Sequence, residues 1–322
     1  MKKRIVSLML AAVTAIGLLA GCGNYGKEAA SQGAGTESGG GEAQGDSTES
    51  KGQEPQGDGT ESGGEGAGGS TVFTTKVFRV GMECSYSPFN WTQSDDSNGA
   101  VPIEGTSDYA YGYDVEMAKR ICEKNGWELQ IYKIDWDGLV LALNSNKIDA
   151  IIAGMGVTED RKKSVDFSDY YWTSDTCMIV KGDSELANAT SLEDFRGCKV
   201  TSQLNSMWMA LISQIPEVDE QPGLGGNSEI LVAVRSGKLD GTILGETEAY
   251  SAIMANPDLA MVKFEKGKGF EVSEQESSAA AAIRKGESDL AEAINAALAE
   301  TPAEERSELM EHILTLQPMV TE

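Results

Sequence analysis

Short apolar runs alternate with helically spaced apolar residues between residues 76 and 316. Runs of three to seven apolar residues are typical of buried strands, whereas apolar residues recurring every three or four positions predict amphipathic helices. The predicted strands are 76–82, 129–134, 150–153, 177–180, 199–201, 239–244 and 261–264. The predicted helices are 113–126, 139–143, 206–215, 228–236, 246–255, 291–298 and 303–316. This alternation predicts an α/β fold with largely parallel sheets.

The strand–helix pattern occurs twice, which predicts two lobes. The first block ends near residue 181, the second begins at 199, and an all-apolar segment at 278–283 leads back to the last two helices. Pro302 is expected as the first residue of the final helix, and the polar stretch 94–111 as a long loop. Two blocks joined by two extended crossings predict a hinge with a ligand-binding cleft between the lobes.

One stretch, residues 149–171, carries the most chemistry. The predicted strand 150–153 leads into Gly154 and Gly156, Thr158 occupies a helix N-cap position, and Arg161 follows three residues later. Backbone N–H groups at a helix start and a bidentate guanidinium together favour a small carboxylate. The alternative is an ordinary strand–helix junction with a surface arginine.

The first 22 residues have the pattern of a targeting segment. Residues 2–4 are basic, and 5–20 form an apolar run that is short for a membrane span. The run ends in Leu-Ala-Gly-Cys at 19–22, which resembles a bacterial lipobox. That resemblance implies removal of signal peptide 1–21 and a diacylglycerol on the thiol of Cys22. A chance cysteine behind an apolar run is the alternative.

Residues 22–72 are expected to tether the folded part to that lipid. From 23 to about 70 the chain consists mainly of Gly, Ser, Gln, Glu and Thr and offers almost nothing to bury. A flexible chain of this length reaches roughly 40 Å. The predicted location is therefore the extracytoplasmic face of the cell membrane, by a lipid anchor and without a spanning helix.

Composition excludes several classes of partner and site. The formal net charge is −25 with a pI near 4.4, which argues against nucleic acid because phosphate binding needs basic surface. The cysteines after residue 22 are Cys84, Cys122, Cys177 and Cys198, and they show no metal-binding spacing. We expect no metal and no cofactor, and the pairing of these cysteines is left open.

Several stretches, in order, resemble one family. They are FRVGM at 78–82, YSPF at 86–89, GYDVE at 112–116, WDGL at 136–139, and the segments 147–171, 194–206 and 239–246. Together they resemble the extracytoplasmic solute-binding proteins of polar amino acid ABC importers. The resemblance implies a two-lobed, type II periplasmic-binding-protein-like fold, each lobe a mostly parallel sheet with flanking helices. Lobe one would comprise 73–181 and 278–322, and lobe two 182–277, with two hinge crossings.

The resemblance also implies roles for residues that would hold an amino acid zwitterion. Arg161 would pair with the α-carboxylate, and Gly154 and Gly156 would contribute backbone groups. Ser206 would complete the carboxylate site from lobe two, and Glu246 would accept the α-ammonium. The alternative for Glu246 is an acid favoured by the positive end of a helix dipole.

Other residues of the resemblance concern the ligand side chain. Tyr86 and Trp136 would sandwich it, and Glu83 could meet its far end, which favours a cationic side chain. The alternatives are a core aromatic for Trp136 and a solvated acid for Glu83. Met155 and Asn205 complete the predicted site as neighbours in the two turns. Many relatives have a hydroxyl residue where Gly156 stands, and a glycine–hydroxyl turn where this chain has Asn-Ser-Met at 205–207.

The implied function is capture of an L-amino acid, basic or polar, by a monomer that delivers it to the permease subunits of an ABC transporter. An enzyme of the same fold, dehydratase-like, is the first alternative. We expect no enzyme, because the only histidine, His312, lies in the last predicted helix, and no nucleophile–base motif occurs. A ligand-sensing module would need an output domain or a membrane span, and a structural lipoprotein would not need the pair of Arg161 and Glu246.

Overall fold

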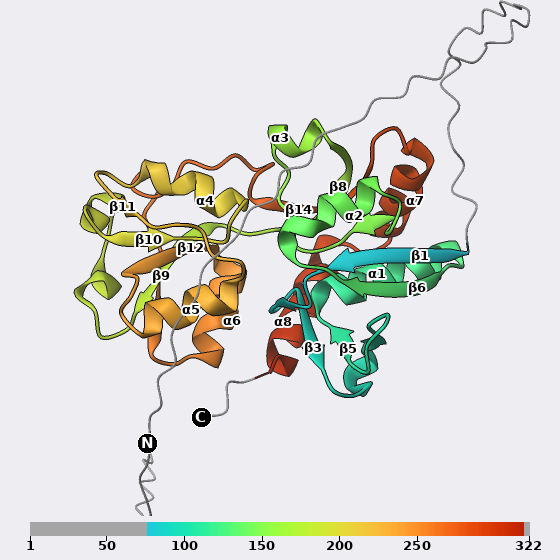
Figure 1. Cartoon of the computed structure of the whole chain (residues 1–322), viewed down its shortest axis with the longest axis horizontal. Helices are drawn as coiled ribbons and strands as arrows, with labels where there is room; N and C mark the ends of the chain where they lie inside the picture. The colour runs from blue at the N-terminus through green and yellow to red at the C-terminus, as the bar shows by residue number, and fades with distance from the viewer. Residues whose placement is uncertain (1–75, 319–322) are drawn as a thin grey trace, which may run out of the picture. The chain divides into compact units, whose positions relative to one another are not determined.

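A computed structural model describes residues 76–318, and the predicted signal peptide, Cys22 and the predicted tether lie outside this range. Two five-stranded sheets dominate it (Figure 1). The first has the order β6-β1-β7-β14-β8, with β1 Val77–Met82, β6 Glu128–Lys133, β7 Ala150–Ile151, β8 Val165–Thr173 and β14 Ser278–Arg284. The second has the order β11-β10-β12-β9-β13, with β9 Thr176–Lys181, β10 Lys199–Thr201, β11 Asp219–Glu220, β12 Gly241–Gly245 and β13 Leu259–Val262.

Both sheets are mixed, with the same division into a parallel and an antiparallel half. In the first, β6, β1 and β7 run parallel, whereas β14 pairs antiparallel with β7 and β8. In the second, β11, β10 and β12 run parallel, whereas β9 pairs antiparallel with β12 and β13. The expected predominance of parallel pairing therefore holds for only half of each sheet. The helical crossovers explain the parallel half.

Helices flank each sheet. The first lobe contains α1 Tyr113–Asn125, α2 Leu139–Asn144, α3 Glu159–Lys162, α7 Ser288–Ala299 and α8 Ala303–Leu316. The second lobe contains α4 Met207–Leu211, α5 Asn227–Arg235 and α6 Glu246–Ala255, which all pack against β12. Short 3-10 turns η1 Ser97–Gly99, η2 Trp136–Gly138, η3 Glu185–Asn188, η4 Leu192–Phe195 and η5 Ile212–Gln214 complete the connections.

The helix ends follow the local sequence. Gly126 ends α1 with a left-handed backbone, φ 67°, as the C-terminal glycine predicts. The Thr158 hydroxyl accepts a hydrogen bond from the backbone N–H of Arg161, so it caps α3 as expected. Pro302 has an extended backbone and is the N-cap of α8, one position before the predicted one.

Part of the stretch predicted as a loop forms strands. A four-stranded sheet of order β2-β3-β5-β4 contains β2 Ser85–Tyr86, β3 Asn90–Gln93, β4 Val101–Pro102 and β5 Tyr109–Tyr111. The pattern of 94–111 is too polar for strand prediction, but pairing of β5 with β3 and β4 satisfies its backbone groups. This sheet supports Tyr86 at its edge.

The first crossing between the lobes lies at Ser174 and Asp175, earlier than the expected boundary at 181. Strand β9 belongs to the second sheet, and its residues Cys177 to Val180 are fully buried in the second core. The returning segment is also more than a crossing, because β14 forms a central strand of the first sheet. None of the helices within 76–318 has the length and apolarity that crossing a membrane would require.

Each lobe has its own apolar core. Phe78, Met117 and Ile151 belong to the first cluster of buried side chains, and Ile179 and Phe195 to the second. The four cysteines of the described range are free thiols, which answers the question that the sequence leaves open.

A buried ion cluster joins three strands of the first sheet below the turn that leads to Arg161. Asp149, 3% exposed, accepts hydrogen bonds from Nη2 of Arg79 at 2.6 Å and from its Nε at 2.9 Å. Arg284 on β14 reaches the same carboxylate at 3.4 Å and donates to the carbonyl of Ile148 at 2.6 Å. The cluster therefore holds the edges of β1, β7 and β14 together.

We predict that Asp149→Asn lowers the free energy of unfolding by about 3 kcal/mol, because it leaves two partly buried guanidinium groups without their counter-ion. Urea denaturation of residues 73–322 measures this loss. Asp160→Asn, an exposed acid paired with Lys163 on α3, is the matched control and should leave the transition midpoint unchanged. Equal effects of the two substitutions would contradict a structural role for the cluster.

Candidate functional site

The turn after β7 is predicted from the sequence to bind an anion through its backbone N–H groups, but the N–H of Gly154 is already bonded within the first lobe. The N–H of Gly154 donates to the Tyr171 hydroxyl at 2.9 Å and lies 3.3 Å from Oδ1 of Asp114. Asp114 is fully buried, and burial raises the pKa of its carboxyl to about 6. The helix α3 has only four residues, so its dipole contributes little. The guanidinium of Arg161 is therefore the main group of this turn that is free to hold an anion.

Arg161 is partly buried and has no acidic partner. Its guanidinium donates to the carbonyl of Gly156 at 2.7 Å and to the carbonyl of Asn205 at 3.1 Å. It also lies 5.0 Å from the ring centroid of Trp136, a cation–π arrangement. No carboxylate of residues 76–318 pairs with it, and burial lowers its pKa to about 10. A desolvated cation held by neutral groups is suited to receive an anion.

The second lobe approaches Arg161 through the turn at 205–207. Asn205 adopts φ 57°, and its side chain donates to Asp137 of the first lobe at 2.8 Å. The Ser206 hydroxyl oxygen caps α4 by accepting from the N–H of Met209 at 3.2 Å. The hydroxyl proton of Ser206 remains available to a ligand.

Gly156 has no room for a side chain in this arrangement. A Cβ there would lie 2.9 Å from the sulfur of Met207 and 2.9 Å from the carbonyl of Glu276. Met155 beside it is buried, and its carbonyl accepts from the N–H of Ala280. The space that a side chain at 156 would need is therefore occupied by Met207 from the second lobe and by the backbone of Glu276.

Two buried acids, one on each lobe, form hydrogen bonds across the cleft. Glu83, directly after β1, accepts from Nε2 of Gln203 at 2.6 Å. Glu248, on α6, accepts from the Tyr86 hydroxyl at 2.8 Å. In the described part of the chain, the Oε2 atom of each carboxylate is buried without a hydrogen-bond partner. Each acid can therefore accept one more donor.

Burial determines the protonation of both acids. It raises the pKa of Glu83 to about 7, although the hydrogen bond from Gln203 acts in the opposite direction. Burial also raises the pKa of Glu248, and the hydrogen bond from Tyr86 lowers it. A cationic group placed at the free oxygens would favour the ionised forms.

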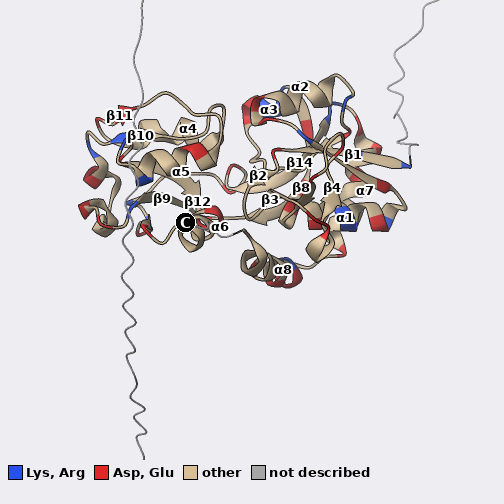
Figure 2. Cartoon of the chain, turned by 60° about the horizontal axis from the view of Figure 1, so that its bottom comes forward, with Lys and Arg blue, Asp and Glu red and all other residues tan. Residues whose placement is uncertain are grey.

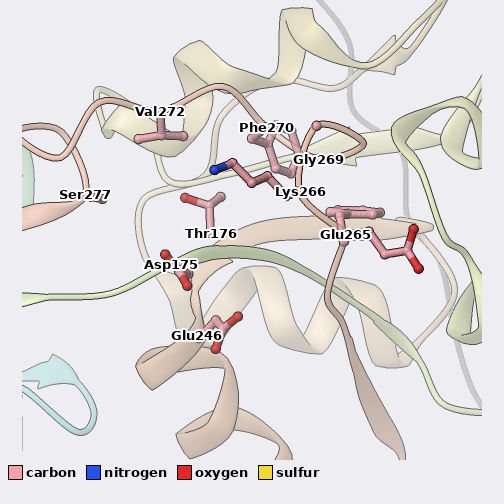
Figure 3. Close-up of a pocket in the computed structure, with 11 residues that line it drawn as sticks. Asp175, Thr176, Glu246, Glu265, Lys266, Gly269, Phe270, Val272 and Ser277 are labelled. Atoms are coloured by element: carbon pink, nitrogen blue, oxygen red, sulfur yellow. The ribbon is translucent and has the colours of Figure 1, made fainter.

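The structure does not bring Glu246 to this cleft, so its expected role is corrected. Its carboxylate pairs with Lys263, and it lines a separate cavity of about 450 Å³ beside the first crossing (Figure 3). Figure 3 shows Glu246 near Asp175 and Thr176, below the segment that carries Lys266. Helix geometry explains the difference, because residues two apart on a helix point to different faces.

Glu248 is the acid that sequence reasoning missed. It occupies the third position of α6, where a glutamate side chain folds back towards the N-cap. The N-cap is Gly245, and a Cβ there would lie 2.4 Å from Oε2 of Glu248. A glutamate three residues after a glycine cap was therefore the available signal. Gln203, Met207 and Trp208 were also missed, because their contacts cross between lobes.

These groups enclose a small cavity between the lobes. Its volume is about 20 Å³, far below the ~300–1,000 Å³ of typical small-molecule sites. It is lined by Tyr86, Trp136, Gly154, Gly156 and Arg161 from the first lobe and by Gln203, Ser206, Met207 and Trp208 from the second. A ligand can occupy this place only if the lobes separate. Of the predicted residues, Glu83, Met155 and Asn205 do not line this cavity, and Glu246 lies outside it and pairs with Lys263.

The family model of bacterial extracellular solute-binding proteins, family 3, matches residues 78–314. The chain belongs to this family. The arginine-binding extracellular protein ArtP of Bacillus subtilis is 30% identical over 230 residues, 70% of this chain and 80% of its own length. The L-cystine-binding protein TcyJ of Escherichia coli is 29% identical over 221 residues, 69% of this chain and 76% of its own.

Solved structures of the family share the fold. An amino acid ABC transporter substrate-binding protein, AbpA of Streptococcus pneumoniae, bound to L-arginine, is 26% identical with a TM-score of 0.63. The similarity covers 74% of this chain and 95% of that one. An ancestral arginine-binding protein bound to arginine is 31% identical with a TM-score of 0.59, covering 74% and 97%. The type II periplasmic-binding fold and the amino acid solute-binding family are thus confirmed.

Acidic side chains dominate the surface around this fold. Figure 2 shows Asp and Glu on helices such as α1, α3 and α8, and also on the second lobe. His312 lies exposed on α8, away from the residues that surround Arg161. The cleft residues are therefore distinguished by burial and missing partners rather than by charge alone.

We predict that Glu83→Gln stabilises the ligand-free protein at pH 8 by about 1–3 kcal/mol. The folded-state pKa of about 7 exceeds the ordinary 4.5 of a glutamate. The folded protein therefore binds the extra proton between these values, and the contribution of Glu83 to stability falls as pH rises through this window. Glutamine keeps an acceptor for Gln203 and carries no charge.

Urea denaturation at pH 4.5 and pH 8 tests this prediction. The stabilisation should be present at pH 8 and absent at pH 4.5, where both forms of the protein carry a neutral group. Glu292→Gln, an exposed acid on α7, serves as the control and should show no such pH dependence. A constant difference at both pH values would show that Glu83 does not titrate as its burial requires.

Proposed function

We propose that this protein captures a basic L-amino acid, such as arginine or lysine, between its lobes and delivers it to the permease of an ABC importer. The observation that carries the proposal is a charge pattern in one closed cleft. Among residues 76–318, the Arg161 guanidinium pairs with no carboxylate, and two buried carboxylates that bond across the lobes each keep one unpartnered oxygen. A basic amino acid has the complementary pattern, with one carboxylate and two cationic groups.

The α-carboxylate is assigned to Arg161. The guanidinium is already oriented by the carbonyls of Gly156 and Asn205 and by the ring of Trp136. A carboxylate can therefore bind without ordering the side chain again, and Ser206 can add a hydroxyl donor. The ligand carboxylate would neutralise the charge of Arg161, which has no ion-pair partner among the described residues.

The two cationic groups are assigned to the two acids. The α-ammonium is assigned to Glu248, because its hydrogen-bond partner Tyr86 lines the same cavity as Arg161. The distal cation is placed at Glu83, where Gln203 leaves one oxygen free. Arginine-bound structures among the relatives support a basic ligand, and the cystine-binding relatives show that the family covers other side chains.

Lobe closure is proposed to depend on the ligand. The bonds from Tyr86 to Glu248 and from Gln203 to Glu83 join opposite lobes but leave each buried acid with an unpartnered oxygen. A bound cation removes that cost, so the ligand stabilises the closed form over the open one. Binding and release then accomplish transport, with no chemical turnover.

We also propose that residues 1–21 are a cleaved signal peptide and that Cys22 carries the lipid. Residues 22–72 would tether the lobes to the extracytoplasmic face of the membrane. The basic residues 2–4, the apolar run and the Leu-Ala-Gly-Cys sequence support this assignment.

Isothermal titration of residues 73–322 at pH 8 should detect binding of L-arginine and L-lysine. Arg161→Ala should weaken both by at least about 100-fold, because a buried charge-paired hydrogen bond is lost. Arg196→Ala, an exposed arginine of the second lobe, is the control and should bind as the parent protein does. Binding that survives Arg161→Ala would remove the carboxylate assignment.

The same titration separates basic from neutral ligands. Glu83→Gln should weaken the binding of L-arginine by at least about 30-fold and leave the binding of L-glutamine unchanged. Only L-arginine has a side-chain charge that pairs with Glu83, so only its binding loses an ion pair. A parent protein that prefers L-glutamine to L-arginine would contradict the basic-ligand assignment.

Expression of the full chain in a lipoprotein-processing bacterium tests the anchor. The parent protein should partition into the membrane fraction and incorporate labelled palmitate, whereas Cys22→Ser should do neither. Cys198→Ser, at a cysteine of the second lobe, is the matched control. Membrane retention of the labelled Cys22→Ser protein would contradict lipidation at this residue.

A further inference from the structure

A second cavity between the lobes is lined by both partners of the hydrogen bond from Tyr86 to Glu248. Its volume is about 170 Å³, and Tyr86 lines both this cavity and the small one beside Arg161. Strand β2 and Ser87 form one wall, and helices α5 and α6 form the opposite wall. Nothing in the binding of a free amino acid requires this space.

Glu248 lines this cavity, and one of its carboxylate oxygens is buried beside Gly245 without a hydrogen-bond partner among the described residues. The residue is 6% exposed, lines the cavity, and has one oxygen bonded to Tyr86 while Oε2 has no partner in the described range. A buried carboxylate oxygen without a partner is stabilised by an N–H donor. An ammonium group stabilises it most, because its hydrogen bond is charge-assisted.

The rest of the lining is neutral. Ser87, Asn227 and Asn256 provide small polar groups, and Leu231 and Ala252 are among the apolar residues. Within the described part of the chain, no lysine, arginine or second acid lines the cavity. The carboxylate of an acidic occupant would find no cation to pair with there. A neutral peptide group could bond to the small polar groups, and one ammonium could pair with Glu248.

The segment after α8 also lines this cavity, through Gln317 and Pro318. Gln317, after α8, is buried and exchanges two hydrogen bonds with Ser251 of α6, one from the Ser251 hydroxyl and one to its carbonyl at 3.2 Å. The cavity is thus bounded on the first-lobe side by two separate segments. Its size is that of roughly five or six water molecules at about 30 Å³ each, room for a small aminoacyl group.

We propose that this cavity is a subsite for an aminoacyl group on the α-nitrogen of the ligand, so that the protein also binds dipeptides with a basic C-terminal residue. The inference rests on the proposed function, which places the α-nitrogen at Glu248. A substituent on that nitrogen continues past Tyr86 into the cavity. The peptide carbonyl of this substituent accepts hydrogen bonds from neutral donors in the lining. Its terminal ammonium pairs with the carboxylate of Glu248.

Titration with three ligands tests the subsite in residues 73–322. Glycyl-L-arginine should bind within about tenfold of L-arginine. Nα-acetyl-L-arginine should bind at least about 30-fold more weakly, because it fills the same space but has no ammonium for Glu248. Mass spectrometry of the bound dipeptide shows that it remains intact.

A cavity-filling substitution supplies the second arm. Ala252→Leu should weaken the binding of glycyl-L-arginine by at least about tenfold and leave the binding of L-arginine unchanged. Of the two cavities, Ala252 lines only the second. Retained L-arginine binding also shows that this variant folds. Ala296→Leu, on the exposed side of α7, is the control and should bind both ligands as the parent does.

The outcomes separate this subsite from the proposed function. If L-arginine binds but glycyl-L-arginine does not, the subsite is wrong and the proposed function stands. If Ala252→Leu weakens both ligands equally, the cavity serves lobe closure rather than ligand extension. A protein that binds neither ligand contradicts the proposed function and the subsite with it.

Discussion

The cleft depends on the cost of burying charge without a partner. Glu83 and Glu248 are removed from water and Arg161 is partly so, and neutral groups give each only part of what water would supply. Such an arrangement is unfavourable for a protein whose only task is to be stable. In a protein that closes around a ligand, the same cost becomes a source of selectivity, because only a ligand with complementary charges removes it.

The scaffold keeps these groups in place by rigid contacts behind them. The ion cluster of Asp149 ties β7, the strand that leads to Gly154, to its neighbours, and Asp114 with Tyr171 holds the N–H of Gly154. These buried polar groups are satisfied, in contrast to the acids of the cleft. The first lobe thus offers a preorganised half-site, and the second lobe brings Gln203, Asn205 and Glu248 to it.

Short-range patterns predicted much of this structure. The start and end of α1, the cap of α3 and the bounds of α6 and α8 follow from spacing and capping, which act over a few residues. The predictions failed where partners are distant. Strands β4 and β5 exist because they pair with each other and with β3, and β9 lies in the second sheet because its apolar residues complete that core.

The sequence by itself determined the two-block α/β organisation, the strand–turn–helix with its arginine and the family resemblance, because these depend on local periodicity and ordered motifs. Only the tertiary structure decided which acid faces the cleft. Glu246 and Glu248 share one helical turn. Glu246 pairs with Lys263, whereas Glu248 is buried and bonds with Tyr86, and this difference depends on residues far away in the chain. Tyr86 is 162 residues from Glu248, and packing of the two lobes brings their side chains together.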